Sequence, residues 1–522
     1  MSEIINETEG SRSYSAYVQR PKIRFENSCD YVLPDYMGDV KRLLKYSVCP
    51  AICDKYNSGN DLTMLCVLNY KVLYIDHEDV LREAVFSSEV EISDRVGDGC
   101  IASEVCVSTD SVSIRLFGPR KICARATAVA QIGITVQEEL EGCELPAEAE
   151  VNTEHINVYT ATVIDGAERE YAEQIARISG VGSDEVDVIS CEALPCVCSS
   201  QVVSGGISVD AYILGRALVC VGEDVFTVEK KIPLDTSIAT EAFLTEDMSA
   251  HVRYDTATVS VSLNNEAEDS AGADYYTSVV LSFTAKPQVR CAQNVTHTVT
   301  ADAFVPYMEN SAECSDLCYD ECIGVAHERR NVSCEASRPE ALLQSVICCD
   351  VQLRDVRYET DTDGVSVRAR ASFKALILAD GDERISCVTE ECDVCEFIKL
   401  SGTDGTCNAL GDISILECNA VFDAEKVYFT ATLKIDVTAT QKRCVRRLCS
   451  LMAEASQSAD RPGITVYYPE KSETVWDVAK RYHVPVETVR RYNGIQNTDV
   501  CTTVLSEDKN HILIFNKRSV QM

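Results

Sequence analysis

The chain has 522 residues, of which 46% are hydrophobic and 25% charged; this composition is ordinary for folded protein, but the chain is too long for one core, so about three or four domains are expected. Its formal net charge of −35, from 83 acidic and 48 basic residues, argues against nucleic acid and anionic membranes as partners because like charges repel. The polar N-terminus and the lack of any stretch of roughly 20 apolar residues predict a cytoplasmic protein without membrane insertion.

Three segments that lie far apart in the chain align without gaps. They are DLTMLCVLNYKVLYI from Asp61, GISVDAYILGRALVC from Gly206 and GVSVRARASFKALIL from Gly364. Each alternates apolar with polar positions and follows a turn, as a half-buried strand of a hairpin does. A basic residue recurs in register, at Lys71, Arg216 and Lys374. A period of about 150 residues is the size of a domain, so we predict three tandem repeats, each a β-sandwich or a partly closed barrel.

A change of period marks a separate C-terminal module. Val475, Val478, Ala479 and Tyr482 recur at helical spacing, and Thr474 with Asp477 forms a variant capping box. A second short helix is expected from about Pro485 to Asn493, with Gly494 as its C-cap. Strand-like segments at 464–468 and 511–515 flank the helices, so the module is predicted to be β-α-α-β. The expected divisions of the chain are a tail at 1–24, repeats at 25–140, 150–290 and 291–449, a linker at 450–462 and the module at 463–518.

The C-terminal module resembles a LysM domain. The matching residues are the strand ITVYY, the turn Ser472-Glu473-Thr474, the helix start Trp476-Asp477-Val478-Ala479, then Tyr482 and Tyr492-Asn493-Gly494. The resemblance implies binding of N-acetylglucosamine polymers in a groove between the first strand–helix loop and the second helix–strand loop. The groove residues that it implies are Ser472, Glu473, Thr474, Asn493, Gly494, Ile495 and Gln496. The implied core residues are Trp476, Val478, Ala479, Tyr482 and Val489.

Two residue choices in this module bear on sugar binding. The turn Ser-Glu-Thr replaces the family's usual Gly-Asp-Thr and so lacks a conformationally free glycine. Trp476 is the only tryptophan of the chain, and its place in the helical stripe favours core packing over sugar stacking.

The repeats resemble the SPOCS domain of clostridial sporulation and spore-coat proteins. The clearest match is YVLPDYMGDVKRLL from Tyr31 to Leu44, and Val72-Leu73-Tyr74 is close to the family's Val-Leu-Tyr. Such repeats followed by one LysM module are the architecture of the SipL-like spore-coat morphogenetic proteins of Clostridia. The resemblance implies a non-enzymatic scaffold in endospore coat assembly, which works in the mother cell at the forespore surface and docks through its LysM module on a SpoIVA-like coat ATPase. The alternative is a peptidoglycan-binding protein of the spore cortex or cell wall.

No enzymatic, cofactor or metal site is predicted. Seven histidines are scattered along the chain without a nucleophile motif, and no phosphate-binding loop of the Gly-x4-Gly-Lys-Ser/Thr type occurs. The segment Asp361-Thr362-Asp363-Gly364 is predicted to be a hairpin turn, because the remainder of a calcium-loop motif is missing.

The 27 cysteines are expected to be mostly reduced in a cytoplasmic protein. Cys314, Cys318 and Cys322 would share one face of a helix near His327, and Cys392 and Cys395 have the spacing of a zinc knuckle. Free thiols are nevertheless favoured over metal binding as the interpretation.

Overall fold

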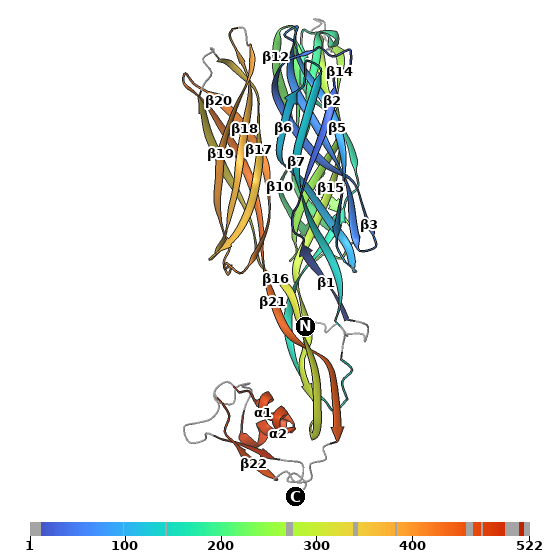
Figure 1. The fold of residues 1–522 in the computed structure, drawn as a ribbon, viewed down its shortest axis with the longest axis vertical. Coiled ribbons are helices and arrows are strands. Elements are labelled where there is room, and N and C mark those ends of the chain that lie inside the picture. Colours follow the sequence, from blue (N-terminus) through green and yellow to red (C-terminus); the bar gives the residue numbers. More distant parts are fainter. Residues whose placement is uncertain are drawn as a thin grey trace.

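The computed structural model describes residues 12–97, 99–140, 143–267, 275–337, 343–381, 384–455, 463–470, 473–495 and 511–515. Strands dominate it: large β units stand side by side above a narrower stalk and a small C-terminal module (Figure 1). The predicted mainly-β multidomain class is therefore confirmed. Among the described residues, no helix has the length and apolar character that crossing a bilayer requires.

Unit 1 contains seven strands: β1 (Arg12–Gln19), β2 (Ile23–Val32), β3 (Val40–Ser58), β4 (Asp61–Asp76), β5 (Leu81–Arg95), β6 (Cys100–Leu116) and β7 (Lys121–Leu140). β4 is the middle strand of one antiparallel sheet, between β3 and β5. In the second sheet β7 is the middle strand; β6 pairs along one edge, and β2 and β1 pair in succession along the other. Buried side chains of both sheets, such as Tyr70 and Ile122, form one core. Unit 1 is thus a β-sandwich.

Units 2 and 3 repeat this arrangement, with two differences. Unit 2 contains β8 (Glu150–Asp165), β9 (Arg169–Ser179), the 3-10 turn η1 (Ser183–Glu185), β10 (Val186–Val203), β11 (Gly206–Val221), β12 (Asp224–Pro233), β13 (Ser237–Ala239), β14 (Ser249–Ala267) and β15 (Tyr275–Phe304). Unit 3 contains β16 (Met308–Ser337), β17 (Leu343–Asp361), β18 (Gly364–Ala379), β19 (Ile385–Lys399), β20 (Asn408–Phe422) and β21 (Lys426–Ala455). Unit 2 adds β13, and unit 3 has the single strand β16 where unit 1 has β1 and β2. The middle strands are β11 and β15 in unit 2, and β18 and β21 in unit 3.

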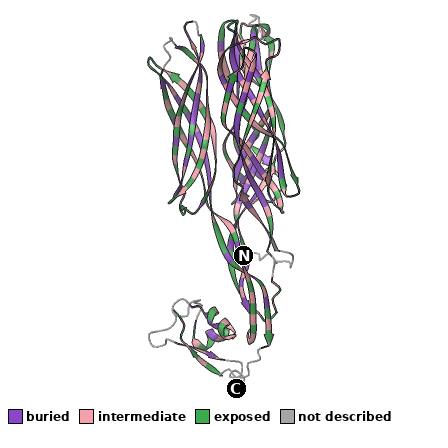
Figure 2. Cartoon of the chain, viewed as in Figure 1, coloured by how far each residue is buried: buried purple, intermediate pink, exposed green. Residues whose placement is uncertain are grey.

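The three segments that align in the sequence are β4, β11 and β18, the middle strand of the same sheet in each unit. More buried and less buried positions alternate along many of the strands, such as β2 (Figure 2), as the period of two predicts. β11 and β18 are instead buried over most of their length. The turn expected at residues 361–364 joins β17 to β18, with Asp361 paired to Gly364.

Strand pairing places the unit boundaries differently from the sequence expectation. β15 runs through the expected boundary at 290, β21 runs through the one at 449, and β1 lies within the expected N-terminal tail. We propose units of 12–140, 150–304 and 308–455, because each of these ranges keeps paired strands together.

The three units close into a ring through the recurring basic residue. Lys71 of unit 1 donates to the carbonyl oxygen of Cys191 in unit 2 at 2.5 Å. Arg216 of unit 2 donates to Asp350 in unit 3 at 2.7 Å, and Lys374 of unit 3 donates to the carbonyl of Tyr46 in unit 1 at 3.0 Å. Beside these contacts lies a buried apolar cluster in which Leu73, Leu218 and Leu376, each two positions after the basic residue, come together. The arrangement is therefore a pseudo-threefold ring.

A stalk continues from the ring toward the C-terminal module (Figure 1). It consists of paired ribbons: β1 with 133–140 of β7, β8 with 288–304 of β15, and 308–322 of β16 with 440–455 of β21. Apolar side chains from all three ribbons form a common cluster, which holds the ribbons together. Its buried members are Tyr14, Ile156, Val158, Val299, Leu317 and Val445.

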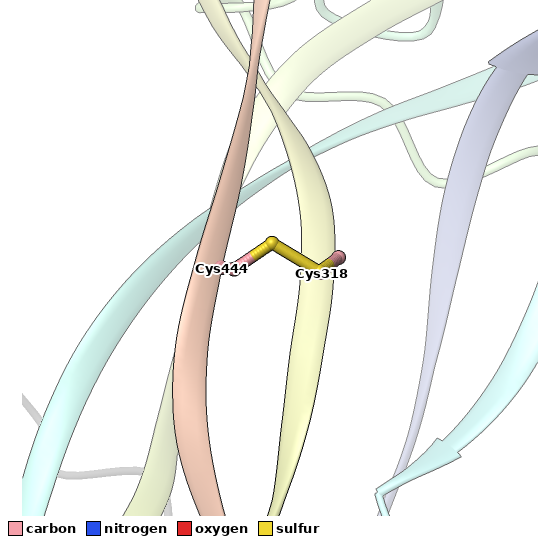
Figure 3. The surroundings of a disulfide bond; sticks show 2 residues. All are labelled: Cys318 and Cys444. Atoms are coloured by element: carbon pink, nitrogen blue, oxygen red, sulfur yellow. A yellow bond between two sulfur atoms is a disulfide. The ribbon is translucent and has the colours of Figure 1, made fainter.

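A disulfide between Cys318 and Cys444 joins opposed positions of β16 and β21 within the stalk (Figure 3). The segment from Cys314 to Cys322 lies within the strand β16. The helical face that was considered for zinc binding does not form. In the part of the chain that the structure describes, no three His, Cys, Asp or Glu side chains are grouped as metal ligands would be.

Candidate functional site

The C-terminal module has the order β22 (Ile464–Tyr467), α1 (Val475–Tyr482), α2 (Val486–Asn493) and β23 (Ile512–Phe515), with β22 and β23 antiparallel. α1 begins with a full capping box: the Thr474 hydroxyl accepts from the backbone N–H of Asp477, whose carboxylate accepts from the backbone N–H of Thr474. α2 ends at Gly494, whose φ of 67° is the left-handed conformation that glycine adopts without strain.

The first expected groove segment has structural partners for its side chains. Glu473 is buried, and its carboxylate accepts from the Tyr467 hydroxyl at 2.8 Å and pairs with Arg481 at 2.8 Å. Thr474 caps α1 as described. The acidic residue that replaces the family's aspartate thus fastens the loop to β22 and α1, and Ser472 lies outside the described residues.

The second expected groove segment is equally engaged. The Asn493 side-chain amide donates to the carbonyls of Val489 and Leu513, both at 2.8 Å, and its oxygen accepts from the N–H of Leu513 at 2.7 Å. Asn493 therefore clamps β23 to α2. Ile495 is buried, and its N–H donates to the carbonyl of Arg490. Gln496 lies outside the described residues.

The expected core residues separate into two groups. Val478, Ala479 and Val489 are buried inside the module, and Tyr482 packs edge-on against Tyr467 at 5.4 Å between ring centroids. Trp476 instead lies at the surface of the module that meets the stalk, where its ring packs edge-on against Phe304 at 5.1 Å.

The joint between module and stalk is centred on Asp302 and Phe304 of β15. The Asp302 carboxylate accepts from the Trp476 ring N–H at 3.0 Å and from the Lys480 ammonium at 2.5 Å. Phe304 has no exposed surface and belongs to the same apolar cluster as the core of the module. The joint thus combines a buried aromatic contact with charge-assisted hydrogen bonds, the stronger kind.

Two further contacts hold the start of α2 and the turn before it. Pro485 precedes α2 and offers no side-chain cap; the Glu150 carboxylate of β8 accepts the Val486 N–H at 3.0 Å instead. Burial raises the pKa of Glu150, although this hydrogen bond opposes the shift. The backbone N–H of Tyr307 donates to the carbonyl of His483 at 2.7 Å. These contacts fix how the module sits on the stalk.

An aromatic pair flanks the two loops that the resemblance assigns to the groove. Tyr468 directly follows β22 and His511 directly precedes β23, with ring centroids 6.0 Å apart. Tyr468 is 63% exposed, so much of its side chain is accessible to a ligand. A sugar ring packs its apolar face on such a surface, and a tyrosine provides both the face and a polar tip. The period of two in ITVYY placed Tyr468 in a strand. It gave no signal that Tyr468, and not another residue of this segment, would be the exposed aromatic residue.

Comparison with known families matches residues 470–500 to the LysM domain. This region of the C-terminal module is a LysM domain. The match spans both helices, with the residues just before α1 and just after α2. No curated protein and no solved structure matches the chain. A LysM domain is a binding module for glycan of the N-acetylglucosamine type, so the comparison supports peptidoglycan or related glycan as a ligand of this region.

Proposed function

We propose that the chain is a non-enzymatic adaptor whose LysM module binds an N-acetylglucosamine-containing glycan and whose ring of three β units is the part held at that surface. The observation that carries the proposal is the LysM match together with the joint at Asp302 and Phe304. A module fixed to the stalk by several contacts transmits its attachment to the whole body.

The position of Trp476 argues against this residue as the one on which a sugar ring stacks. Its indole N–H is already donated to Asp302 and its ring packs on Phe304, so stacking on Trp476 would require the module to leave the stalk. Among the described residues beside the groove loops, Tyr468 is the most exposed aromatic residue, at 63% against 39% for Tyr492. We therefore assign the sugar contact to Tyr468 and to the two loops that it flanks.

A second candidate is the scaffold in endospore coat assembly, in which the LysM module docks on a SpoIVA-like coat ATPase. The engagement of Glu473, Thr474 and Asn493 in the fold of the module favours it, because these side chains are then less available to hydrogen-bond a sugar. The resemblance of the repeats to SPOCS domains supports the same role and a location at the forespore surface.

Co-sedimentation of the full chain with purified peptidoglycan tests the choice. Pelleting that N-acetylglucosamine oligomers compete away, and that Tyr468→Ala abolishes, supports the glycan adaptor. Tyr36→Ala is the matched control, since Tyr36 is 83% exposed and lies in unit 1. Folded protein that stays in the supernatant overturns the glycan assignment; pull-down with the purified coat ATPase then tests the second candidate directly.

A further inference from the structure

A cavity of about 660 Å³ lies where the three units meet. Unit 1 contributes Tyr17 and Glu104, unit 2 contributes His251 and Arg290, and unit 3 contributes Asp412. The volume falls within the range of small-molecule sites, roughly 300–1,000 Å³. The cavity lies where the ring meets the stalk, because Tyr17 and Arg290 belong to stalk ribbons. Neither the LysM module nor its joint lines it.

A continuous series of polar contacts forms one wall of the cavity. Arg290 donates to the Tyr17 hydroxyl at 3.0 Å and to Glu104 at 3.1 Å. Arg253 lies between Glu104 and Asp412, at 3.6 Å and 2.9 Å respectively. Burial opposes ionisation of Glu104 and Asp412, but the neighbouring arginines hold the pKa of both carboxyls below the usual value. The wall is therefore charged, buried and internally paired.

His251 is the exception, because its ring nitrogen Nε2 has no hydrogen-bond partner among the described residues. Its exposed fraction is 9%, and Nδ1 lies 3.3 Å from Asp436. Burial lowers the pKa of the ring, so the neutral form donates from Nδ1 and leaves a lone pair on Nε2. Nε2 is buried, and in the part of the chain that the structure describes the carboxylate near it, that of Asp412, is 3.7 Å away and has no proton to donate. Leaving a buried acceptor unpaired is unfavourable, and a ligand N–H or O–H would relieve this cost.

The rest of the lining favours an anion. In a chain of net charge −35, the cavity is lined by seven Lys and Arg side chains against five Asp and Glu. Two of the cations have no ion pair among the described residues: Lys22, which donates to the carbonyl of Val356 at 3.1 Å, and the exposed Arg357 next to it. Two unpaired cations side by side attract an anionic group.

We propose that this cavity binds a small organic anion, with its carboxylate or phosphate group at Lys22 and Arg357 and a hydroxyl or N–H donor on Nε2 of His251. Since all three units line the cavity, the bound molecule also bridges the ring.

Calorimetric titration of the full chain with three probes tests the proposal. Citrate and glucose 6-phosphate each combine an anionic group with a hydroxyl, and glucose is the uncharged control. Binding of citrate alone identifies the carboxylate form, binding of glucose 6-phosphate alone identifies the phosphate form, and glucose is expected to give no heat of binding.

The double variant Lys22→Gln with Arg357→Gln is expected to weaken binding at least about tenfold. Both residues are exposed at the rim, so the substitutions leave the fold intact. Arg115→Gln with Lys442→Gln removes the same charge from exposed positions outside the cavity and should bind as the unmodified chain does. His251→Asn is expected to weaken binding as well. Absence of binding by both anions, or equal affinity in the rim variant and its control, overturns the proposal.

Discussion

The joint between the LysM module and the stalk depends on Phe304, and Phe304→Ala tests this dependence. Phe304 is fully buried between the stalk and the module. Removing a buried phenylalanine side chain costs about 3–5 kcal/mol, and the edge-on contact with Trp476 adds about 0.5–1.5 kcal/mol. Because each 1.4 kcal/mol is a factor of ten, the docked state should lose at least about 100-fold in population relative to the undocked state.

The fluorescence of Trp476 reports this change directly, since it is the only tryptophan in the chain. In the docked module its ring packs on Phe304 and its N–H is donated to Asp302. Undocking exposes the ring to water, so emission should shift to longer wavelength and acrylamide should quench it more strongly. Hydrogen exchange at the amides of α1 distinguishes undocking, which preserves their protection, from unfolding of the module.

Phe243→Ala is the matched control, because Phe243 is 87% exposed and lies in unit 2, away from the joint. It should leave both emission and quenching unchanged. Emission and quenching of Phe304→Ala that equal those of the unmodified chain would refute the packing argument, since Trp476 would then be sheltered by something other than Phe304.

Three other perturbations have defined outcomes. Arg216→Met removes the contact with Asp350 that joins units 2 and 3 and should lower the free energy of unfolding by about 2 kcal/mol in urea, whereas Arg125→Met, in an exposed pair with Glu26, should cost under about 1 kcal/mol. Burial lowers the pKa of His251 below its unfolded value, so its contribution to stability is complete above about pH 6.5 and is lost as pH falls through the folded pKa. The melting temperature should therefore decline on acidification below neutrality, and His251→Gln should make that decline shallower; an unchanged slope would contradict the burial of a neutral ring. Cys318→Ser with Cys444→Ser should lower the unfolding free energy by about 2–4 kcal/mol and make stability insensitive to reductant, while Cys449→Ser, at an exposed free thiol, should leave both unchanged.

The features that follow from local pattern could be predicted from the sequence. Alternation in the segment from Gly206 identified a strand, although β11 is buried over most of its length and not on one face alone. Thr474 with Asp477 identified the start of α1. Both predictions depend on residues that are close together in the chain, so the hydrophobic period and the capping residues can be read from the sequence. The LysM groove was placed by resemblance, and the structure adds that Glu473 and Asn493 are occupied within the fold.

The features that depend on distant contacts could not be predicted. The sequence shows that a basic residue recurs at Lys71, Arg216 and Lys374. Lys71 and Lys374, however, donate to backbone carbonyls, which have no sequence signature. Trp476 has the spacing of a core residue, yet the surface on which it packs comes from β15. Cys318 and Cys444 are separated by 126 residues, and pairing of distant cysteines cannot be read from spacing.

The closure of the units into a ring constrains how such a chain can evolve. In an open array each added copy needs only one new interface, so gene duplication can lengthen it freely. Here every unit already contacts both others through Lys71, Arg216 or Lys374. A fourth copy would have to break one existing interface and change the angle between all the others. A change in copy number would therefore disrupt the contacts made by Lys71, Arg216 and Lys374 and the apolar cluster beside them.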